Sequence, residues 1–98
     1  MTAVLNEPLA QLAVEGDLDA RALPRFCASL QELLAGHPAR LVLDLSQCAF
    51  VDAAALAALL EAHRTTARYG GELVLAGCTP RVLRLLCLTG LGRVFTLR

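Results

Sequence analysis

The feature that most constrains the fold is a short apolar run that leads through a tight connection into a helix start. Residues 41–60 read L-V-L-D-L-S-Q-C-A-F-V-D-A-A-A-L-A-A-L-L. Leu41 to Leu45 is apolar except at Asp44, which is typical of a strand covered on both faces in a largely parallel sheet. Asp52 can cap the following helix, because its carboxylate accepts hydrogen bonds from free N–H groups of the first turn and suits the helix dipole.

The rest of the chain alternates between strand and helix patterns. We expect strands at residues 3–5, 10–15, 41–45, 72–76 and 94–97, with a turn at Asn6-Glu7-Pro8. Helices are expected from near Pro24 to Gly36, from Asp52 to about Arg68, and from Thr79-Pro80 to Thr89-Gly90. The order ββαβαβαβ predicts an α/β fold with a mixed, mainly parallel sheet and right-handed crossover helices. We treat residues 1–98 as a single domain.

Helical periodicity also predicts which side chains are buried. The first helix should bury Leu23, Phe26, Cys27, Leu30, Leu33 and Leu34. The second should bury Leu56, Leu59, Leu60, His63 and Ala67, and the third Val82, Leu83 and Leu86. Residues 10–15 alternate as a half-covered edge strand does, and Asp19 can cap a preliminary turn before Pro24.

Composition excludes several classes of function. With 56% hydrophobic but only 4% aromatic residues, the core must be aliphatic. Nine basic and nine acidic residues give no net charge, which argues against nucleic acid or an anionic membrane as the main partner. No run approaches the roughly 18 apolar residues of a membrane span, and the N-terminus lacks a signal-peptide pattern, so we expect a cytoplasmic protein without direct membrane insertion.

Three motifs, in order along nearly the whole chain, resemble the STAS domain family of bacterial anti-sigma factor antagonists. The first is Gly16-Asp17-Leu18-Asp19, which is similar to the family's G-x-L-D opening. The second is a strand that ends in D-L-S, followed by a short loop, Asp52 and a helix that carries L-x-x-L-L at 56–60. The third, L-C-L-T-G-L-G-R-V-F at 86–95, is similar to the closing L-x-x-x-G-L-x-x-x-F. The resemblance implies a STAS fold that serves as a non-catalytic protein–protein interaction module.

The resemblance also identifies a phosphorylation position that this chain has lost. In the family, the aspartate is usually followed by Ser-Ser-Gly-Leu, and a partner kinase phosphorylates the first serine. Here Asp52 is followed by Ala53, Ala54, Ala55 and Leu56. A methyl group cannot accept phosphate, so we expect no switch at Ala53. Thr79 and Ser46 remain alternative phosphoacceptors.

The predicted partner contacts lie in three segments of the sequence. The implied partner-binding residues are Asp52, Ala53, Ala54, Ala55, Leu56, Asp17, Asp19, Cys78 and Thr79. The implied partner is an anti-sigma factor kinase or a related regulator. The alternatives are an accessory STAS subunit of an ABC-type phospholipid transporter and a scaffold STAS protein.

The end of the chain suggests a second contact surface. Family members usually continue with a further helix after the last strand, whereas this sequence stops at Arg98. Apolar surface near Val94, Phe95 and Leu97 would then stay open to a homodimer or another partner. After Glu72 the only charged residues are arginines, which form either a solvated face or a surface for an acidic partner: Arg81, Arg84, Arg93 and Arg98.

The sequence gives little indication of a catalytic site, a metal site or a redox site. Ser46, His37 and Asp44 are the residue types of a nucleophile triad, but no G-x-S-x-G elbow surrounds the serine. We therefore expect no enzyme, no cofactor and no metal site, since the cysteines lack ligand-like spacing. Cys48 and Cys78 each follow a parallel strand, and they are either buried thiols or a redox-sensitive pair beside Asp52.

Overall fold

The computed structural model describes residues 1–6 and 9–98, and side chains at 1–3 and 9–98. Its strands are β1 (Thr2–Asn6), β2 (Leu9–Glu15), β3 (Arg40–Gln47), β4 (Glu72–Ala76) and β5 (Thr96–Leu97). Its helices are α1 (Leu23–Leu34), α2 (Ala53–Arg68) and α3 (Pro80–Leu88), with a short 3₁₀ helix, η1 (Leu91–Arg93). The predicted order of strands and helices is confirmed. The predicted turn at Asn6-Glu7-Pro8 falls on residues 7–8, outside the described residues.

All strands belong to one sheet in the order β1-β2-β3-β4-β5. The β1–β2 pair is antiparallel and the other pairs are parallel, as expected from the element order. The predicted edge strand at residues 10–15 is wrong in one respect: β2 lies between β1 and β3, so β1 forms the edge.

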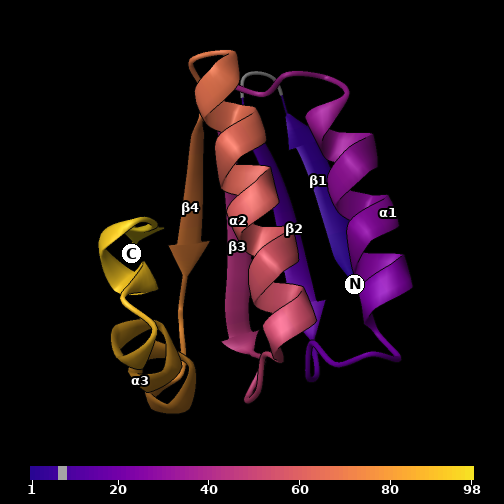
Figure 1. Cartoon of the computed structure of the whole chain (residues 1–98). Coiled ribbons are helices and arrows are strands. Elements are labelled where there is room, and N and C mark those ends of the chain that lie inside the picture. Colours follow the sequence, from indigo (N-terminus) through magenta and orange to yellow (C-terminus); the bar gives the residue numbers. More distant parts are fainter. Residues whose placement is uncertain (7–8) are drawn as a thin grey trace.

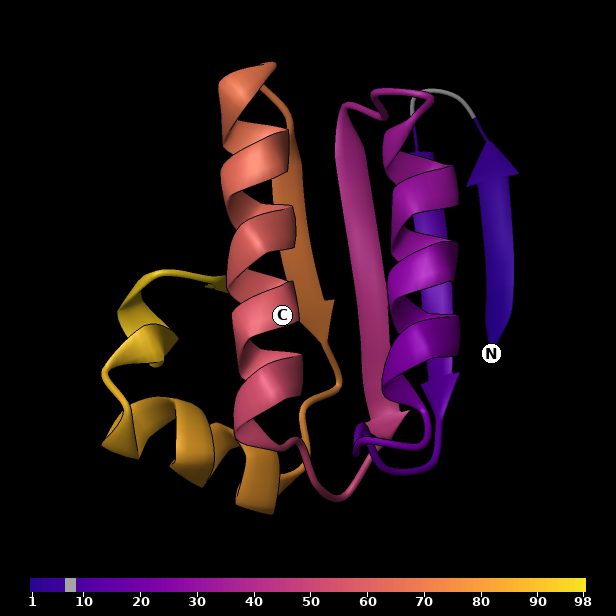
Figure 2. The same cartoon turned by 45° about the vertical axis from the view of Figure 1, so that its right-hand side comes forward.

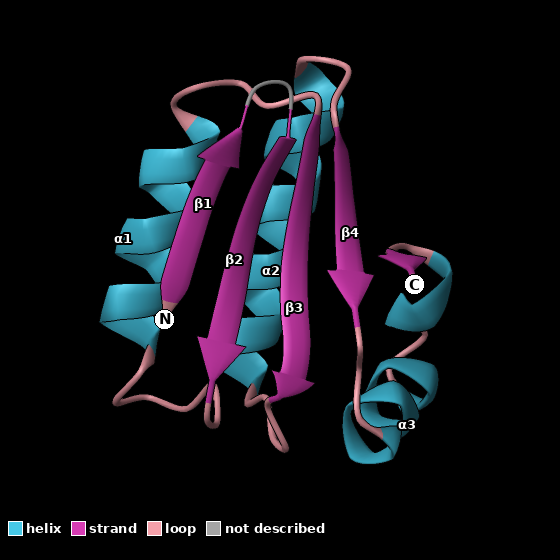
Figure 3. Ribbon diagram, turned by 180° about the vertical axis from the view of Figure 1, so that it is seen from behind, coloured by secondary structure: helices cyan, strands magenta, loops and turns pink. Residues whose placement is uncertain are grey.

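Helices cover one face of this sheet only. Each parallel connection steps to the next strand in the same direction, and right-handed crossovers that never reverse place their helices on a common side. Figure 1 shows α1 and α2 lying across the front of the strands. From behind, Figure 3 shows the strands with no helix over them. The expectation that β3 is covered by structure on both faces is therefore wrong.

The helix-covered face holds the main core. It is aliphatic, as composition predicted, and its fully buried side chains include Leu12, Leu18, Leu41, Leu43, Leu45, Leu59, Leu73 and Leu75, with Phe26 from α1. The other face carries a small separate cluster of Val42, Val74 and Ala76. Beside it, Arg40 and Glu72 pair across β3 and β4 at 3.7 Å. Neighbouring side chains, not a helix, shield these valines.

The buried stripes of the helices differ in detail from the predicted ones. On α2 the buried residues are Ala55, Leu56, Leu59, Ala62 and Thr66, whereas Leu60 and His63 are half-buried and Ala67 is exposed. The stripe is thus rotated about the helix axis. It includes a threonine whose hydroxyl donates to the carbonyl of His63 at 2.8 Å. On α1 only Phe26, Leu30 and Leu33 are fully buried, and on α3 Leu83 is 42% exposed, not buried as predicted.

The C-terminal segment also departs from expectation. The predicted strand from Val94 begins only at Thr96, because residues 91–93 coil into η1 after the left-handed Gly90. Phe95 is buried and packs edge-on against the His63 ring, with centroids 5.9 Å apart, so its predicted exposure is wrong. Val94 and Leu97 are exposed as predicted. None of the helices in the described part of the chain has the length and apolar character needed to cross a bilayer.

Candidate functional site

The carboxyl ends of β2, β3 and β4 meet at one edge of the sheet, the lower edge in Figure 1. The loops that leave this edge are residues 16–19, 48–52 and 77–79, and we call them together the carboxyl rim. The rim brings together the two motifs that the sequence pointed to, Gly16–Asp19 and Asp52–Leu56. It also brings Cys48 and Thr79 close together.

Backbone hydrogen bonds join the first two rim loops. The N–H of Leu18 donates to the carbonyl of Phe50 at 2.9 Å, and the N–H of Asp52 donates to the carbonyl of Leu18 at 3.0 Å. Leu18 and Val51 form a parallel bridge, and both side chains are buried. The start of α2 is therefore held to the loop after β2 by main-chain contacts.

Asp52 caps α2 as predicted. Its backbone is extended, and its Oδ1 accepts from the N–H of Ala55 at 2.8 Å. Ala53 and Ala54 are exposed at the helix start, so two methyl groups face solvent where the helix begins. Ala55 and Leu56 are buried in the core, so the exposed part of the predicted contact segment at the helix start is Ala53 and Ala54.

The two acidic residues of the Gly16–Asp19 motif have different roles. The Oδ1 of Asp19 accepts from the N–H groups of Arg21 at 3.1 Å and Ala22 at 3.2 Å, which confirms that it caps the turn before α1. Asp17 is exposed. Of the pair, Asp17 is the more exposed.

The hydroxyl of Thr79 is already engaged in the fold. It donates to the carbonyl of Cys48 at 3.2 Å and accepts from the N–H of Val82 at 3.4 Å, which caps α3. Phosphorylation of Thr79 would remove the proton that it donates to Cys48, so modification would break this contact between the two rim loops. Ser46 is exposed at the end of β3, and its backbone N–H donates to Asp44 Oδ1 at 3.0 Å.

The pKa of Asp44 is lowered, and the largest cause is the hydrogen bond from the backbone N–H of Ser46. The Ser46 side chain and the charge of Arg98 act in the same direction, and partial burial opposes them. The suspected triad is not assembled: His37 precedes β3 and packs edge-on against Tyr69, whereas Ser46 lies at the opposite end of that strand.

The two thiols at the rim differ in exposure, because Cys78 is half-buried and Cys48 is not accessible. Cys48 is fully buried, and its Sγ donates to the carbonyl of Phe50 at 3.3 Å. Burial raises the pKa of both the Cys48 and the Cys78 thiols, which disfavours the reactive thiolate. Across residues 1–6 and 9–98, no three side chains of histidine, cysteine or acidic type gather in a way that could hold a metal ion.

Next to the rim lies a groove that the sequence did not predict. It measures about 240 Å³, lies between residues 49–51 and α3, and is lined by Ala49, Phe50, Val51, Arg81, Val82, Arg84, Leu85 and Leu88. Phe50 is 38% exposed, and the Arg81 guanidinium lies 5.6 Å from the centre of its ring. Figure 2 shows α3 beside the amino end of α2. An aromatic residue in a loop, Phe50, was the available signal.

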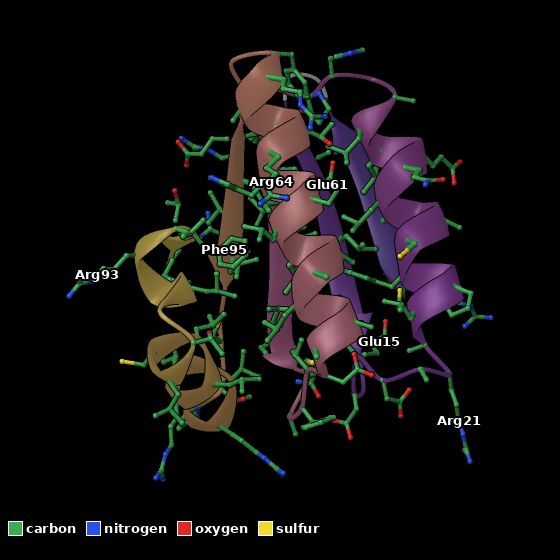
Figure 4. All side chains as sticks on the ribbon, viewed as in Figure 1. Glu15, Arg21, Glu61, Arg64, Arg93 and Phe95 are labelled. Atoms are coloured by element: carbon green, nitrogen blue, oxygen red, sulfur yellow. The ribbon has the colours of Figure 1, made fainter. Side chains whose placement is uncertain are left out.

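A larger hollow lies on the other side of α3. It measures about 590 Å³ and is lined by Leu83, Cys87, Gly90, Gly92, Arg93 and Leu97. Leu97 belongs to the C-terminal surface that the sequence predicted to be open. In Figure 4, Arg93 points away from the body of the molecule, while Phe95 turns inward.

Known proteins share both the sequence pattern and the fold. Residues 4–98 match the family model described as "Mlab, STAS domain". The anti-sigma-B factor antagonist of Listeria monocytogenes is 27% identical over 85 residues, which span 87% of this chain and 75% of that protein.

Two solved structures illustrate the shared fold. A candidate anti-sigma factor antagonist from Thermotoga maritima superposes with a TM-score of 0.89 at 20% identity, covering 98% of this chain and 83% of that one. The Bacillus cell fate determinant SpoIIAA, in its phosphorylated form, gives a TM-score of 0.76 at 15% identity over 99% and 89% of the two chains.

Proposed function

The chain belongs to the STAS domain family, and from this premise we propose that it is a non-catalytic, cytoplasmic protein-binding module of the anti-sigma factor antagonist type. Its partner is an anti-sigma factor kinase or a related regulatory protein. The surface that docks onto this partner consists of Asp17, Asp52, Ala53 and Ala54, and we call it the docking face.

One observation carries the proposal. Asp52 keeps its capping bond to the N–H of Ala55, while Ala53 and Ala54 are exposed and carry no hydroxyl. Ala53 is the residue that the family resemblance matches to the phosphorylated serine. Phosphate on a side chain adds about two negative charges. SpoIIAA has been solved in a phosphorylated form, but this chain cannot carry that charge at Ala53. Docking is therefore controlled by the amount of protein, or the chain serves as a permanent scaffold.

Capture with a charged variant tests the docking face. Immobilised wild-type protein should retain an anti-sigma factor kinase from lysate of the source bacterium, and Ala54→Asp should lose it because the new carboxylate is desolvated in the interface. Ala28→Asp places the same change on an exposed position of α1 and controls for helix propensity. Equal capture by the Ala54 and Ala28 variants would refute the docking face.

Phosphorylation by the captured kinase provides a second readout. With ATP, the wild-type chain should gain no phosphate at residue 53 or at Thr79, whose hydroxyl is bonded to Cys48 and Val82. Ala53→Ser should be labelled at residue 53, and its capture should then weaken on labelling. If immobilised Ala53→Ser captures an anti-sigma factor kinase that never labels it, the proposed antagonist-type function is contradicted.

A second candidate is an accessory subunit of an ABC-type phospholipid transporter. The observation in its favour is that the matching family model is described as "Mlab, STAS domain", with no mention of an antagonist. The same capture experiment distinguishes the two functions, because a transporter ATPase would be retained in place of a kinase.

A further inference from the structure

Helix α3 carries two positive charges that no acidic side chain of the described chain neutralises. Arg81 lies in its first turn, and Arg84 follows three residues later on a neighbouring position of the helix surface. Neither takes part in an ion pair within the described part of the chain. A cation near a helix N-terminus opposes the dipole by about 0.3–1 kcal/mol, and like charges three residues apart repel. The stability of α3 therefore does not account for both arginines, because within the fold only Arg81 has a contact for its charge, the ring of Phe50.

Beside these charges lies an apolar surface that water can reach. Leu88 is 76% exposed and Phe50 is 38% exposed, and both line the 240 Å³ groove between residues 49–51 and α3. That volume is below the roughly 300–1,000 Å³ of typical small-molecule pockets. It suits a few inserted apolar side chains.

We propose that this groove binds an acidic amphipathic helix of a protein partner. The partner's apolar side chains, spaced three and four residues apart, would enter between Phe50 and Leu88, as in other helix-in-groove complexes. Its carboxylates would pair with Arg81 and Arg84, and relieve their mutual repulsion. The inference rests on the proposed function, because Val51 connects the groove directly to Asp52 and so extends the docking face.

The charge and shape of the site favour a protein segment over a membrane surface. The whole chain has no net charge, so attraction to anionic lipid would come from α3 alone. A concave site between a loop and a helix accepts inserted side chains, whereas a flat bilayer cannot fill it. The guanidinium of Arg81 also lies over the Phe50 ring, and this contact fixes its direction. A guanidinium held in one direction suits a carboxylate at a fixed position on a partner.

Selection from a peptide library tests the proposal without the native partner. Phage-displayed random 16-residue peptides are selected on the immobilised full chain, and enriched peptides are synthesised and measured by fluorescence anisotropy. Enrichment of acidic sequences with leucine or phenylalanine at helical spacing is expected. Arg81→Glu/Arg84→Glu should weaken them about tenfold or more, the size expected when two exposed ion pairs become repulsive.

The control variant Arg25→Glu/Arg93→Glu has the same net charge, with both changes outside the groove. It should bind the enriched peptides as wild type does, and thermal unfolding followed by circular dichroism confirms that both variants fold. Leu88→Asp, at an exposed position, should also weaken binding.

Three results would overturn the proposal. The first is that no acidic amphipathic peptides are enriched. The second is that the two double variants bind the enriched peptides equally. The third is that the wild-type chain binds anionic phospholipid vesicles and Arg81→Glu/Arg84→Glu does not. Because Ala54→Asp tests the docking face separately by capture, failure of the peptide test alone leaves the proposed function standing.

Discussion

The four cysteines differ in how far their side chains are exposed to solvent. Cys87 is exposed, Cys27 and Cys78 are half-buried, and Cys48 is fully buried. Burial also raises the pKa of Cys48 and Cys78, so little thiolate forms at neutral pH. In native protein, iodoacetamide should modify Cys87 first and Cys48 only after unfolding, as followed by peptide mass spectrometry. Modification of Cys48 as fast as Cys87 without denaturant would instead support a redox-sensitive rim.

The side chain of Asp44 makes the stability of the fold depend on pH. Its pKa is lowered by the N–H of Ser46 in the folded state, so the carboxylate stabilises the fold above its unfolded pKa. This contribution is lost as pH falls through the lower, native pKa. Asp44→Asn should therefore reduce the free energy of unfolding near pH 7 by at most about 1 kcal/mol, since the site is close to solvent.

The Asp44→Asn deficit should shrink in acid, as measured by urea unfolding at several pH values. Asp17→Asn, at an exposed carboxylate, reports the change common to surface aspartates. A deficit that stays constant from neutral to strongly acidic pH would contradict the assigned role of Ser46.

Among the elements, those with strong local signals were predictable. The strand Glu72–Ala76 has the predicted bounds, and the cap of α2 at Asp52 was read from the residue type alone. The start of β5 was not predictable, because η1 forms where Phe95 packs against His63, a contact with a distant helix. The groove at Phe50 escaped notice for the same reason: its two walls are far apart in sequence. Local residue patterns therefore predict single caps and strands, whereas the groove depends on tertiary contacts between distant segments.

Two glycines that follow elements of the fold should respond differently to a methyl group. Gly77 follows β4 with φ +67°, and an added Cβ would lie 3.0 Å from Ser46 Cβ. Gly90 follows α3 with φ +77°, and its added Cβ would meet nothing within 4 Å. Gly90→Ala should cost about 1–2 kcal/mol for the left-handed backbone alone. Gly77→Ala should cost more, because Ser46 must also move. Urea midpoints at constant slope measure both, and an equal or smaller loss at Gly77 would contradict the predicted crowding.

For the whole molecule, the one-directional strand order has an energetic consequence. Val14 lies in the helix-covered core and is 1% exposed, whereas Val74 lies on the face without helices and is 3% exposed. Both belong to interior strands, so strand propensity and the lost methyl groups are matched. They differ in what remains after truncation: an enclosed cavity at Val14, but a depression that water can fill at Val74.

Val14→Ala should therefore cost about 2–3 kcal/mol, the transfer term plus a cavity term. Val74→Ala should cost only about 1–2 kcal/mol, because its small cluster on the face without helices leaves no sealed void. Chemical denaturation of both variants at low protein concentration gives the comparison. Equal losses would contradict an uncovered second face. If the Val74 loss grew with protein concentration, a second copy of the chain would be the cover, because only association makes the stability of a folded monomer depend on concentration.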